Sequence, residues 1–244
     1  MARQSTSDPL PVLLTRPEEQ SRAFAANLVQ RFGSRLRPVI SPLMAIEYLT
    51  PDVPEGPFSG LIFTSANAVE AALRLRFPLP NKAWCVGEKT ASRAGAAGFA
   101  ARSADGDADA LVAAILASPP EGRLLHLRGE DTRGEVADRL RAGGVETAEA
   151  VVYRMSRCAL STEAKELLQS KGVVIVPLFS PRSAMLFSEE LPEDRMARLQ
   201  LVALSAAIAE AATVPDADMV VVRKPSALAM LDAIGNFLDK GASP

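Results

Sequence analysis

Short apolar runs alternate with amphipathic segments along most of the chain, a pattern typical of parallel strands covered by helices on both faces. The opening segment is the clearest. Residues 11–14 are apolar, and Pro17 then favours a helix start because proline loses no hydrogen bond at a first helical position. Apolar side chains at four-residue spacing, followed by Gly33, predict a helix over residues 17–32, and residues 35–40 return as a strand.

A proline-rich stretch from Ser41 to Pro57 interrupts this rhythm and is interpreted as a crossover or linker. The rhythm resumes at Phe58. Beyond it the pattern predicts, in order, a strand ending in FTS at residues 63–65, a helix from about Ser65, a strand at residues 84–87, a helix to Gly98, a strand near Ala100 and a helix over residues 107–117.

The chain then repeats the order of these segments, which indicates an ancient duplication. The run LLTRP at residue 13 has a counterpart in LLHLRG at residue 124, and LIFTSANAVEAAL has one in VVIVPLFSPRSAML. WCVGEKTASRA similarly matches LVALSAAIAEA, and a last helix, expected over residues 226–238, matches the one beginning near Asp107. The matches keep their order at an offset of roughly 112 to 118 residues.

Composition and charge narrow the class of protein. The 244 residues are 48% hydrophobic, which suits one large or two small domains, and 27 Lys and Arg against 29 Asp and Glu give a net charge of −2. Without a long basic run, nucleic acid is not expected as a partner. The polar N-terminus and the short apolar runs predict neither secretion nor membrane insertion. Cys85 and Cys158 are interpreted as reduced thiols of a cytoplasmic protein.

The common cofactor and catalytic signatures are missing from the sequence. It contains no phosphate loop of the GxxxxGKS/T type, no GxGxxG turn, no GxSxG elbow and no HExxH helix. The one histidine, His126, lies in an apolar strand segment, where a structurally satisfied core histidine is favoured over a catalytic base. A single histidine also cannot build a multi-histidine metal site.

Small hydroxyl-bearing residues follow three of the expected strands. They lie in the turns Thr64-Ser65, Gly87 to Thr90 and Ser180-Pro181, each where a helix is expected to start. Ser65 and Ser180 are expected to cap their helices, which contributes about 1 kcal/mol for each helix. Free N–H groups of helix starts at the carboxyl ends of parallel strands also bind carboxylates, and this second interpretation is compatible with capping.

Six short motifs in a fixed order resemble the uroporphyrinogen-III synthase family along almost the whole chain. They are LLTRP at 13–17, FTSANAVEA at 63–71, VGEKTA at 86–91, RGEDTRG at 128–134, VVYR at 151–154 and FSPRSA at 179–184. Because the family diverges widely, no single motif is specific. Their common order and spacing are specific.

The resemblance implies a fold of two flavodoxin-like α/β domains with parallel sheets, which face each other across a cleft and are joined by two linker segments. The first domain is expected to comprise residues 1–40 and 157–244, and the second residues 42–155, with linkers near residue 41 and at residues 153–157. The duplication fits this arrangement, since each repeat would place its first two strands in one domain and the rest in the other.

The resemblance also implies the chemistry. The family's substrate is hydroxymethylbilane, a linear tetrapyrrole with eight carboxylates, which is closed to uroporphyrinogen III with loss of water and inversion of ring D through a spiro intermediate. No cofactor and no metal are implied, because holding the bilane in the right conformation is largely control of proximity and orientation. Tyr153, expected at the second linker, is the candidate catalytic residue, donating a hydrogen bond or proton to the departing hydroxyl; the alternative is a packed residue that ends a strand.

Substrate contacts are expected from the strand-to-helix turns and from nearby arginines. A substrate with eight negative charges needs local positive charge on a protein of net charge −2. Alternatively, each arginine pairs with a neighbouring acid, such as Glu18 or Glu130. The expected substrate-binding residues are Arg16, Thr64, Ser65, Asn67, Gly87, Thr90, Arg128, Gly129, Ser180, Pro181, Arg182 and Ser183.

The second repeat departs from the family at one turn, where Ser205 and Ile208 replace the usual Gly and Thr. Other classes stay open: a bilobal sensor that closes on an anion or a tetrapyrrole without chemistry, a flavodoxin-type flavin or nucleotide protein, which the missing phosphate loop disfavours, and a hinge protein with no ligand. The chain is expected to be a monomer that contacts hydroxymethylbilane synthase transiently.

Overall fold

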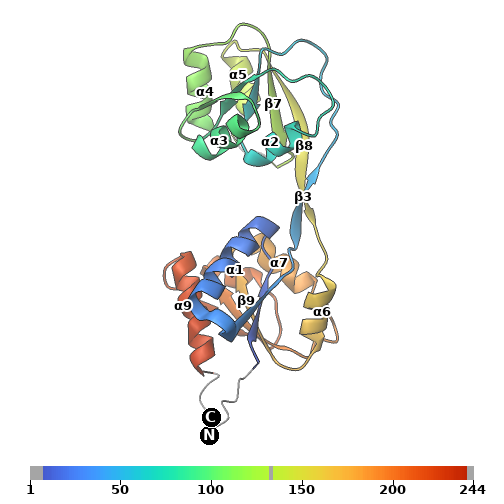
Figure 1. Ribbon diagram of the computed structural model, residues 1–244, viewed down its shortest axis with the longest axis vertical. Coiled ribbons are helices and arrows are strands. Elements are labelled where there is room, and N and C mark those ends of the chain that lie inside the picture. The colour runs from blue at the N-terminus through green and yellow to red at the C-terminus, as the bar shows by residue number, and fades with distance from the viewer. Residues whose placement is uncertain (1–7, 132–133, 241–244) are drawn as a thin grey trace. The chain divides into compact units, whose positions relative to one another are not determined.

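The computed structural model describes residues 8–131 and 134–240, which divide into two compact units (Figure 1). Unit 1 comprises the described residues up to Ala45 and those from Arg157 onward, and unit 2 comprises Ile46–Ser156. Thr132 and Arg133 of the RGEDTRG motif lie outside the described residues.

Unit 1 contains a five-stranded parallel sheet in the order β11-β10-β9-β1-β2. Counted along the unit, this is the flavodoxin-like order 2-1-3-4-5, which reverses direction between β1 and β9. The strands are β1 (Leu10–Leu14), β2 (Leu36–Ile40), β9 (Val173–Leu178), β10 (Arg198–Ala203) and β11 (Asp218–Val221). The helices are α1 (Glu18–Phe32), the 3-10 helix η1 (Gly33–Arg35), α6 (Thr162–Gln169), α7 (Pro181–Glu189), α8 (Ala206–Ala211) and α9 (Ala227–Lys240).

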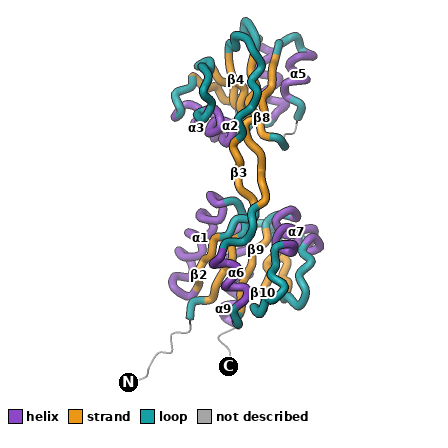
Figure 2. The backbone as a smooth tube through the Cα atoms, turned by 90° about the vertical axis from the view of Figure 1, so that its right-hand side faces the viewer, coloured by secondary structure: helices purple, strands orange, loops and turns teal. Residues whose placement is uncertain are grey.

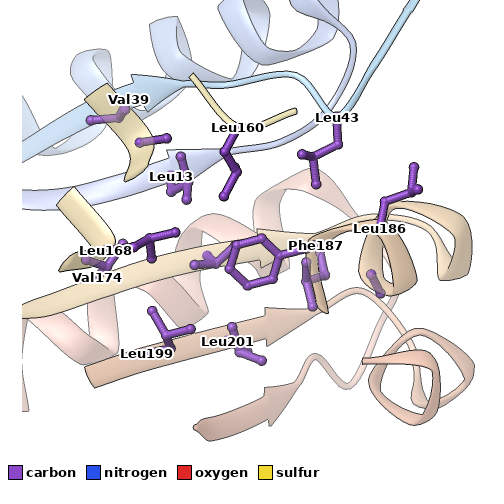
Figure 3. Close-up of a cluster of buried hydrophobic side chains, with 14 of the residues drawn as sticks. Leu13, Val39, Leu43, Leu160, Leu168, Val174, Leu186, Phe187, Leu199 and Leu201 are labelled. Carbon is purple, nitrogen blue, oxygen red and sulfur yellow. The ribbon is translucent and has the colours of Figure 1, made fainter. Parts of the chain in front are cut away.

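Helices cover both faces of this sheet, so successive residues of β1 enter different hydrophobic cores. Leu13 packs in a cluster with side chains of α6, α7 and α8, including Leu168 and Phe187 (Figure 3). Its neighbours Val12 and Leu14 pack on the opposite face with α1 and α9. A strand that is buried on both faces has an unbroken run of apolar residues. This explains why short apolar runs, and not alternating apolar and polar residues, mark the strands in this sequence.

Unit 2 contains a six-stranded sheet in the order β3-β8-β7-β4-β5-β6, in which the pairs from β8 to β6 are parallel. The strands are β3 (Met44–Tyr48), β4 (Gly60–Phe63), β5 (Lys82–Cys85), β6 (Ala100–Ser103), β7 (Leu124–Gly129) and β8 (Thr147–Arg157). The helices are α2 (Ala66–Ala72), α3 (Glu88–Ala96), α4 (Ala108–Ala117) and α5 (Val136–Ala142). Two cores again flank the sheet, one under α2 and α3 and one under α4 and α5.

The two units repeat one strand order. Strands β7 and β8 correspond to β1 and β2, and β4, β5 and β6 correspond to β9, β10 and β11. The order of neighbours therefore agrees with the duplicated motifs of the sequence. The predicted α/β fold with parallel sheets is confirmed.

Local predictions were most accurate where one turn of chain decides the structure. The first helix was expected over residues 17–32 and is α1, preceded by Pro17 and followed by Gly33 at a φ of +59°, which glycine adopts without strain.

Among the described helices, none combines the length and apolarity needed to cross a bilayer.

The proline-rich stretch contains a strand, β3, that the pattern did not predict. It lies beside β8 in the sheet (Figure 2). Its residues alternate between exposed and half-buried, so they carry no apolar run. Strand β8 continues through residues 153–157, where a linker was expected, and Arg154 forms a two-pronged ion pair with Glu47 of β3 at 2.9 and 3.0 Å. Strands β3 and β8 are far apart in the sequence, and each is extended by pairing with the other in the sheet.

Candidate functional site

Three of the predicted site residues line one pocket at the carboxyl edge of the unit 2 sheet. The pocket has a volume of about 400 Å³ and is lined by Thr64, Ser65, Val86, Asp107, Ala108, Asp131, Gly134 and Tyr153. It adjoins the ends of β4 and β7, where the strand order reverses and open α/β sheets bind ligands. Two larger pockets of unit 2, each of about 640 Å³, contain none of the predicted residues, so volume alone does not locate the site.

The turn after β4 is held by its own hydroxyl groups. Ser65 adopts an extended backbone at the start of α2, and its side chain accepts a hydrogen bond from the backbone N–H of Asn67 at 3.1 Å. The predicted capping role of Ser65 is confirmed. Thr64 Oγ1 lies 3.4 Å from Nε2 of His126 on β7. The turn is thus anchored to the neighbouring strand.

Tyr153 reaches the pocket because Gly129 leaves room for its ring. The two residues are partners across β7 and β8, next to an irregularity in the register between Arg128 and Gly129. A Cβ atom on Gly129 would lie 2.7 Å from Cζ of Tyr153, which is closer than real Cβ contacts. The backbone N–H of Glu130 donates to the Tyr153 carbonyl at 2.9 Å. In the structure, then, Gly129 has a clear steric role beside the ring.

Behind the pocket, a partly buried polar row of Thr64, His126 and Glu149 runs from the turn after β4 across β7 to β8. His126 is almost wholly buried, and its Nδ1 lies 3.6 Å from Oε1 of Glu149. That contact is longer than a hydrogen bond, and Nδ1 has no hydrogen-bond partner among the described residues, so the histidine is less satisfied than predicted. The His126 ring, with the guanidinium groups of Arg128 and Arg141, holds the pKa of Glu149 at about 2.

Arg128 and Arg16 have different partners from those suggested by sequence proximity. Arg128 Nε lies 2.9 Å from Oε1 of Glu149, whereas from Glu130 it contacts only the carbonyl oxygen. Arg16 Nε donates to Gln20 at 3.0 Å. Glu18 pairs instead with Arg22, at 2.6 Å, because those two side chains lie one helical turn apart.

In unit 1 the corresponding turn follows β9. Ser180 caps α7 by accepting from the Ser183 backbone N–H at 3.1 Å, and the two hydroxyl oxygens lie 2.8 Å apart. Pro181 and Arg182, both exposed, occupy the first turn of α7. Arg16 stacks on the ring of Phe179 with its guanidinium carbon 4.2 Å from the centroid, and burial lowers the Arg16 pKa. Arg16 thus lies against Phe179, the residue just before the turn that carries the other predicted residues of unit 1.

The turn after β5 contributes differently. Gly87 precedes α3, and Thr90 is buried inside that helix with its backbone N–H donating to the Gly87 carbonyl at 3.1 Å. Neither residue lines the pocket, which Val86 borders instead. In unit 1, Ser205 precedes α8 without a side-chain cap, and Ile208 is buried at the position of Thr90.

Sequence reasoning missed the carboxylates of the pocket, Asp107 and Asp131. Asp107 accepts hydrogen bonds from the backbone N–H groups of Asp109 and Ala110, at 2.9 and 3.1 Å, which lower its pKa and keep it ionised. Its place before an apolar helix was a signal for a cap, not for a site. The described residues contain no group of three or more His, Cys, Asp or Glu arranged to hold a metal ion.

The fold and the site define a class of protein. It is a duplicated α/β protein whose strand-to-helix turns carry arginines and hydroxyl groups that cap the helices, with a tyrosine beside one of these turns. Within that class, residues 23–232 match the family described as uroporphyrinogen-III synthase HemD. The chain belongs to this family. It is therefore an enzyme of tetrapyrrole biosynthesis that closes a linear tetrapyrrole into the type III ring.

One solved structure supports the fold over nearly the whole chain. A uroporphyrinogen-III synthetase from Helicobacter pylori is 18% identical, with a TM-score of 0.56 over 94% of this chain and 99% of that one. A mutant uroporphyrinogen III synthase from Thermus thermophilus is 16% identical, with a TM-score of 0.39 over 95% of this chain and 99% of that one. Comparison with the sequences of curated proteins gives no match.

Proposed function

We propose that the pocket beside Tyr153 holds the reacting end of hydroxymethylbilane while ring D is inverted. The observation that carries this proposal is that Thr64, Ser65 and Tyr153, from two motifs far apart in the sequence, line one pocket. A volume of about 400 Å³ lies in the range of small-ligand pockets and suits part of the bilane, not all of it.

In this proposal Tyr153 is the catalytic residue. Its phenol donates a hydrogen bond or a proton to the terminal hydroxyl, which leaves as water. The proton consumed in this step is balanced by the one that the unsubstituted α-carbon of ring D loses when the ring recloses. The azafulvene cation that remains is attacked by the substituted α-carbon of ring D, and the spiro pyrrolenine so formed fragments and recloses with ring D reversed. Asp107 and Asp131 are well suited to this end of the substrate, because carboxylates stabilise a cation and accept hydrogen bonds from pyrrole N–H groups.

The carboxylates of the bilane need other partners. We assign them to the turn residues that carry N–H groups, hydroxyls or guanidinium groups outside the acidic pocket. In unit 1 these are Arg16, Ser180, Arg182 and Ser183, and Pro181, which has no N–H to donate, shapes the turn that carries them. In unit 2 they are Asn67, Gly87, Thr90 and Arg128. Charge-assisted hydrogen bonds from arginine and from helix starts are the strongest contacts that a protein offers to a carboxylate.

We further propose that the enzyme works as a cytoplasmic monomer without a cofactor, and that hydroxymethylbilane synthase delivers its substrate in a transient contact. The chemistry supports direct delivery, because the free bilane closes spontaneously without inverting ring D. No disulfide joins Cys85 and Cys158, which is consistent with a reducing compartment.

The decisive experiment is product analysis. Freshly prepared hydroxymethylbilane is incubated with and without the protein, the products are oxidised, and the type I and type III uroporphyrin isomers are separated by chromatography. Predominant type III is expected. Type I alone, formed at the spontaneous rate, would contradict the proposal and favour a sensor that binds without turnover.

A further inference from the structure

The polar row behind the pocket links a residue that lines it to a buried histidine. His126 on β7 lies between Glu149 on β8 and Thr64 in the turn after β4. The distance from Thr64 Oγ1 to His126 Nε2 is 3.4 Å, and that from His126 Nδ1 to Glu149 Oε1 is 3.6 Å. The histidine side chain is only 3% exposed. Its two ring nitrogens therefore face protein groups, not water.

The charges around Glu149 decide which nitrogen carries the proton. Its Oε1 lies 2.9 Å from Arg128 Nε, and its Oε2 lies 3.6 Å from Arg141 Nη2. The His126 ring, together with these two guanidinium groups, holds the pKa of Glu149 at about 2, so the carboxylate is ionised. Of the two neutral tautomers of the imidazole, a carboxylate facing Nδ1 favours the one that carries its proton there, which leaves a lone pair on Nε2. Nε2 then accepts the hydroxyl proton of Thr64.

The fold does not need this row. In unit 1 the register partners at the corresponding places are Leu14 and Ile40, and Phe179 takes the place of Thr64. An apolar filling there completes the same sheet. Burying polar side chains instead costs free energy unless they are paired, so the row in unit 2 calls for a role beyond folding.

We propose that His126, oriented by Glu149, is a positioning residue that turns the Thr64 hydroxyl into a hydrogen-bond acceptor for a pyrrole N–H of the substrate. A hydroxyl has one proton and two lone pairs, so a proton committed to His126 leaves the oxygen to accept. The inference rests on the proposed function, in which this pocket holds hydroxymethylbilane. It adds a selection rule: the site at Thr64 receives N–H donors, not substrate carboxylates.

The proton position is measurable without substrate, because His126 is the only histidine. Tag-free protein labelled with ¹⁵N in the imidazole ring is expected to show, at neutral pH, one neutral tautomer with the proton on Nδ1. A proton on Nε2, or a charged ring, would overturn the inference. Glu149→Gln is expected to abolish the preference, whereas Glu146→Gln, which changes an exposed acid paired with Arg123, leaves it intact.

Kinetics test the acceptor itself. Thr64→Val keeps the shape of the side chain and is expected to lower kcat/KM for type III product about tenfold, the loss of one hydrogen bond, while Thr64→Ser retains activity. His126→Leu, the residue type that unit 1 has there, is expected to cost the same factor, with no further loss when it is combined with Thr64→Val. Circular dichroism confirms folding, and His126→Gln replaces His126→Leu if the latter does not fold.

The outcomes separate the two proposals. Wild-type turnover of Thr64→Val beside a slowed Tyr153→Phe would overturn the positioning role alone, as would additive losses in the double variant. If both Thr64→Val and Tyr153→Phe retain wild-type turnover, this pocket is not the substrate site, and both proposals are wrong whatever the tautomer of His126.

Discussion

The two units fill equivalent positions of their sheets with different kinds of side chain, apolar in unit 1 and polar in unit 2. Where the strand order of unit 1 reverses, Leu14 on β1 is the register partner of Ile40 on β2. The Phe179 ring packs edge-on against Phe24, with 5.0 Å between the ring centroids, and Arg16 stacks on Phe179. At the reversal of unit 2, His126 faces Glu149, and Thr64 completes a polar row.

This difference separates the demands of folding from those of chemistry. Both sets of side chains complete a parallel sheet, so the fold specifies only that the space be filled. The polar set in unit 2 adjoins the pocket with Tyr153, whereas the aromatic set in unit 1 supports an arginine. Function therefore resides in side chains placed on a shared framework.

The largest effect is expected where unit 2 makes room for its tyrosine. Gly129→Ala should lower the rate of type III formation about a hundredfold or more, because its Cβ would lie 2.7 Å from Cζ of Tyr153 and displace the ring. Gly95→Ala in α3 is the control, since a Cβ there meets nothing within 4 Å. Unchanged turnover of Gly129→Ala would remove the steric role assigned to this glycine.

Acid is expected to weaken the polar row of unit 2 and to spare the apolar row of unit 1. The folded pKa of Glu149, about 2, lies below its ordinary value of 4.5, so its stabilisation is complete above pH 4.5 and is lost as the pH falls toward 2. Because solvent screens this partly exposed carboxylate, its contribution to the free energy of unfolding is about 1–2 kcal/mol. Urea unfolding followed by the fluorescence of Trp84, the only tryptophan and part of β5, measures it.

Glu149→Gln should flatten that pH dependence between pH 4.5 and pH 2 and should lower stability at pH 7. The Glu163→Gln variant in unit 1, which alters an exposed ion pair with Arg37, should leave the dependence in place. Equal slopes for wild type and Glu149→Gln would show that Glu149 does not distinguish the units.

Tyr153→Phe is expected to lower kcat for type III product about tenfold to a hundredfold and to leave some activity. A phenol is a weak acid and contributes only part of the catalysis, so the reaction should be slowed without being abolished. Tyr48→Phe is a matched control, because Tyr48 is the only other tyrosine. If Tyr153→Phe and Tyr48→Phe have equal rates, Tyr153 is not catalytic and only packs in the strand.

The arginine of unit 1 should affect binding more than chemistry. Arg16→Gln is expected to raise KM about tenfold with little change in kcat, as the loss of one charge-assisted contact does. Arg22→Gln, which alters an exposed pair on the outside of α1, should leave KM unchanged. A fall in kcat with constant KM would place Arg16 nearer the reacting atoms.

The smallest effects should be shared by the two units. Ser65→Ala and Ser180→Ala each remove a helix cap and should cost about 1 kcal/mol of stability. Ser180→Ala should cost slightly more, because Ser183 also bonds to its hydroxyl. Thermal unfolding followed by circular dichroism measures both, with Ser65→Thr and Ser180→Thr as controls that keep the hydroxyl. No loss in either alanine variant would contradict the capping role.

Much of the fold was predictable because its signals are local. Pro17 and Gly33 bracket α1 within one residue of the predicted limits, and Ser65 and Ser180 cap the helices expected to follow them. Strand β3 was not predictable, since its alternation is weak and its partner β8 lies about a hundred residues later in the chain.

For the candidate site, the local sequence specified the turns: which of them carry hydroxyls, arginines and a tyrosine, and that the two repeats carry different ones. Which of these residues meet depended on how the strands are arranged in the sheet. This arrangement brought Thr64 and Tyr153 to one pocket, supplied Asp131 from the loop after β7, and set His126 against Glu149. The physical reason is that capping and periodicity act within a few residues, whereas contacts between strands depend on sheet order and register, which no short segment contains.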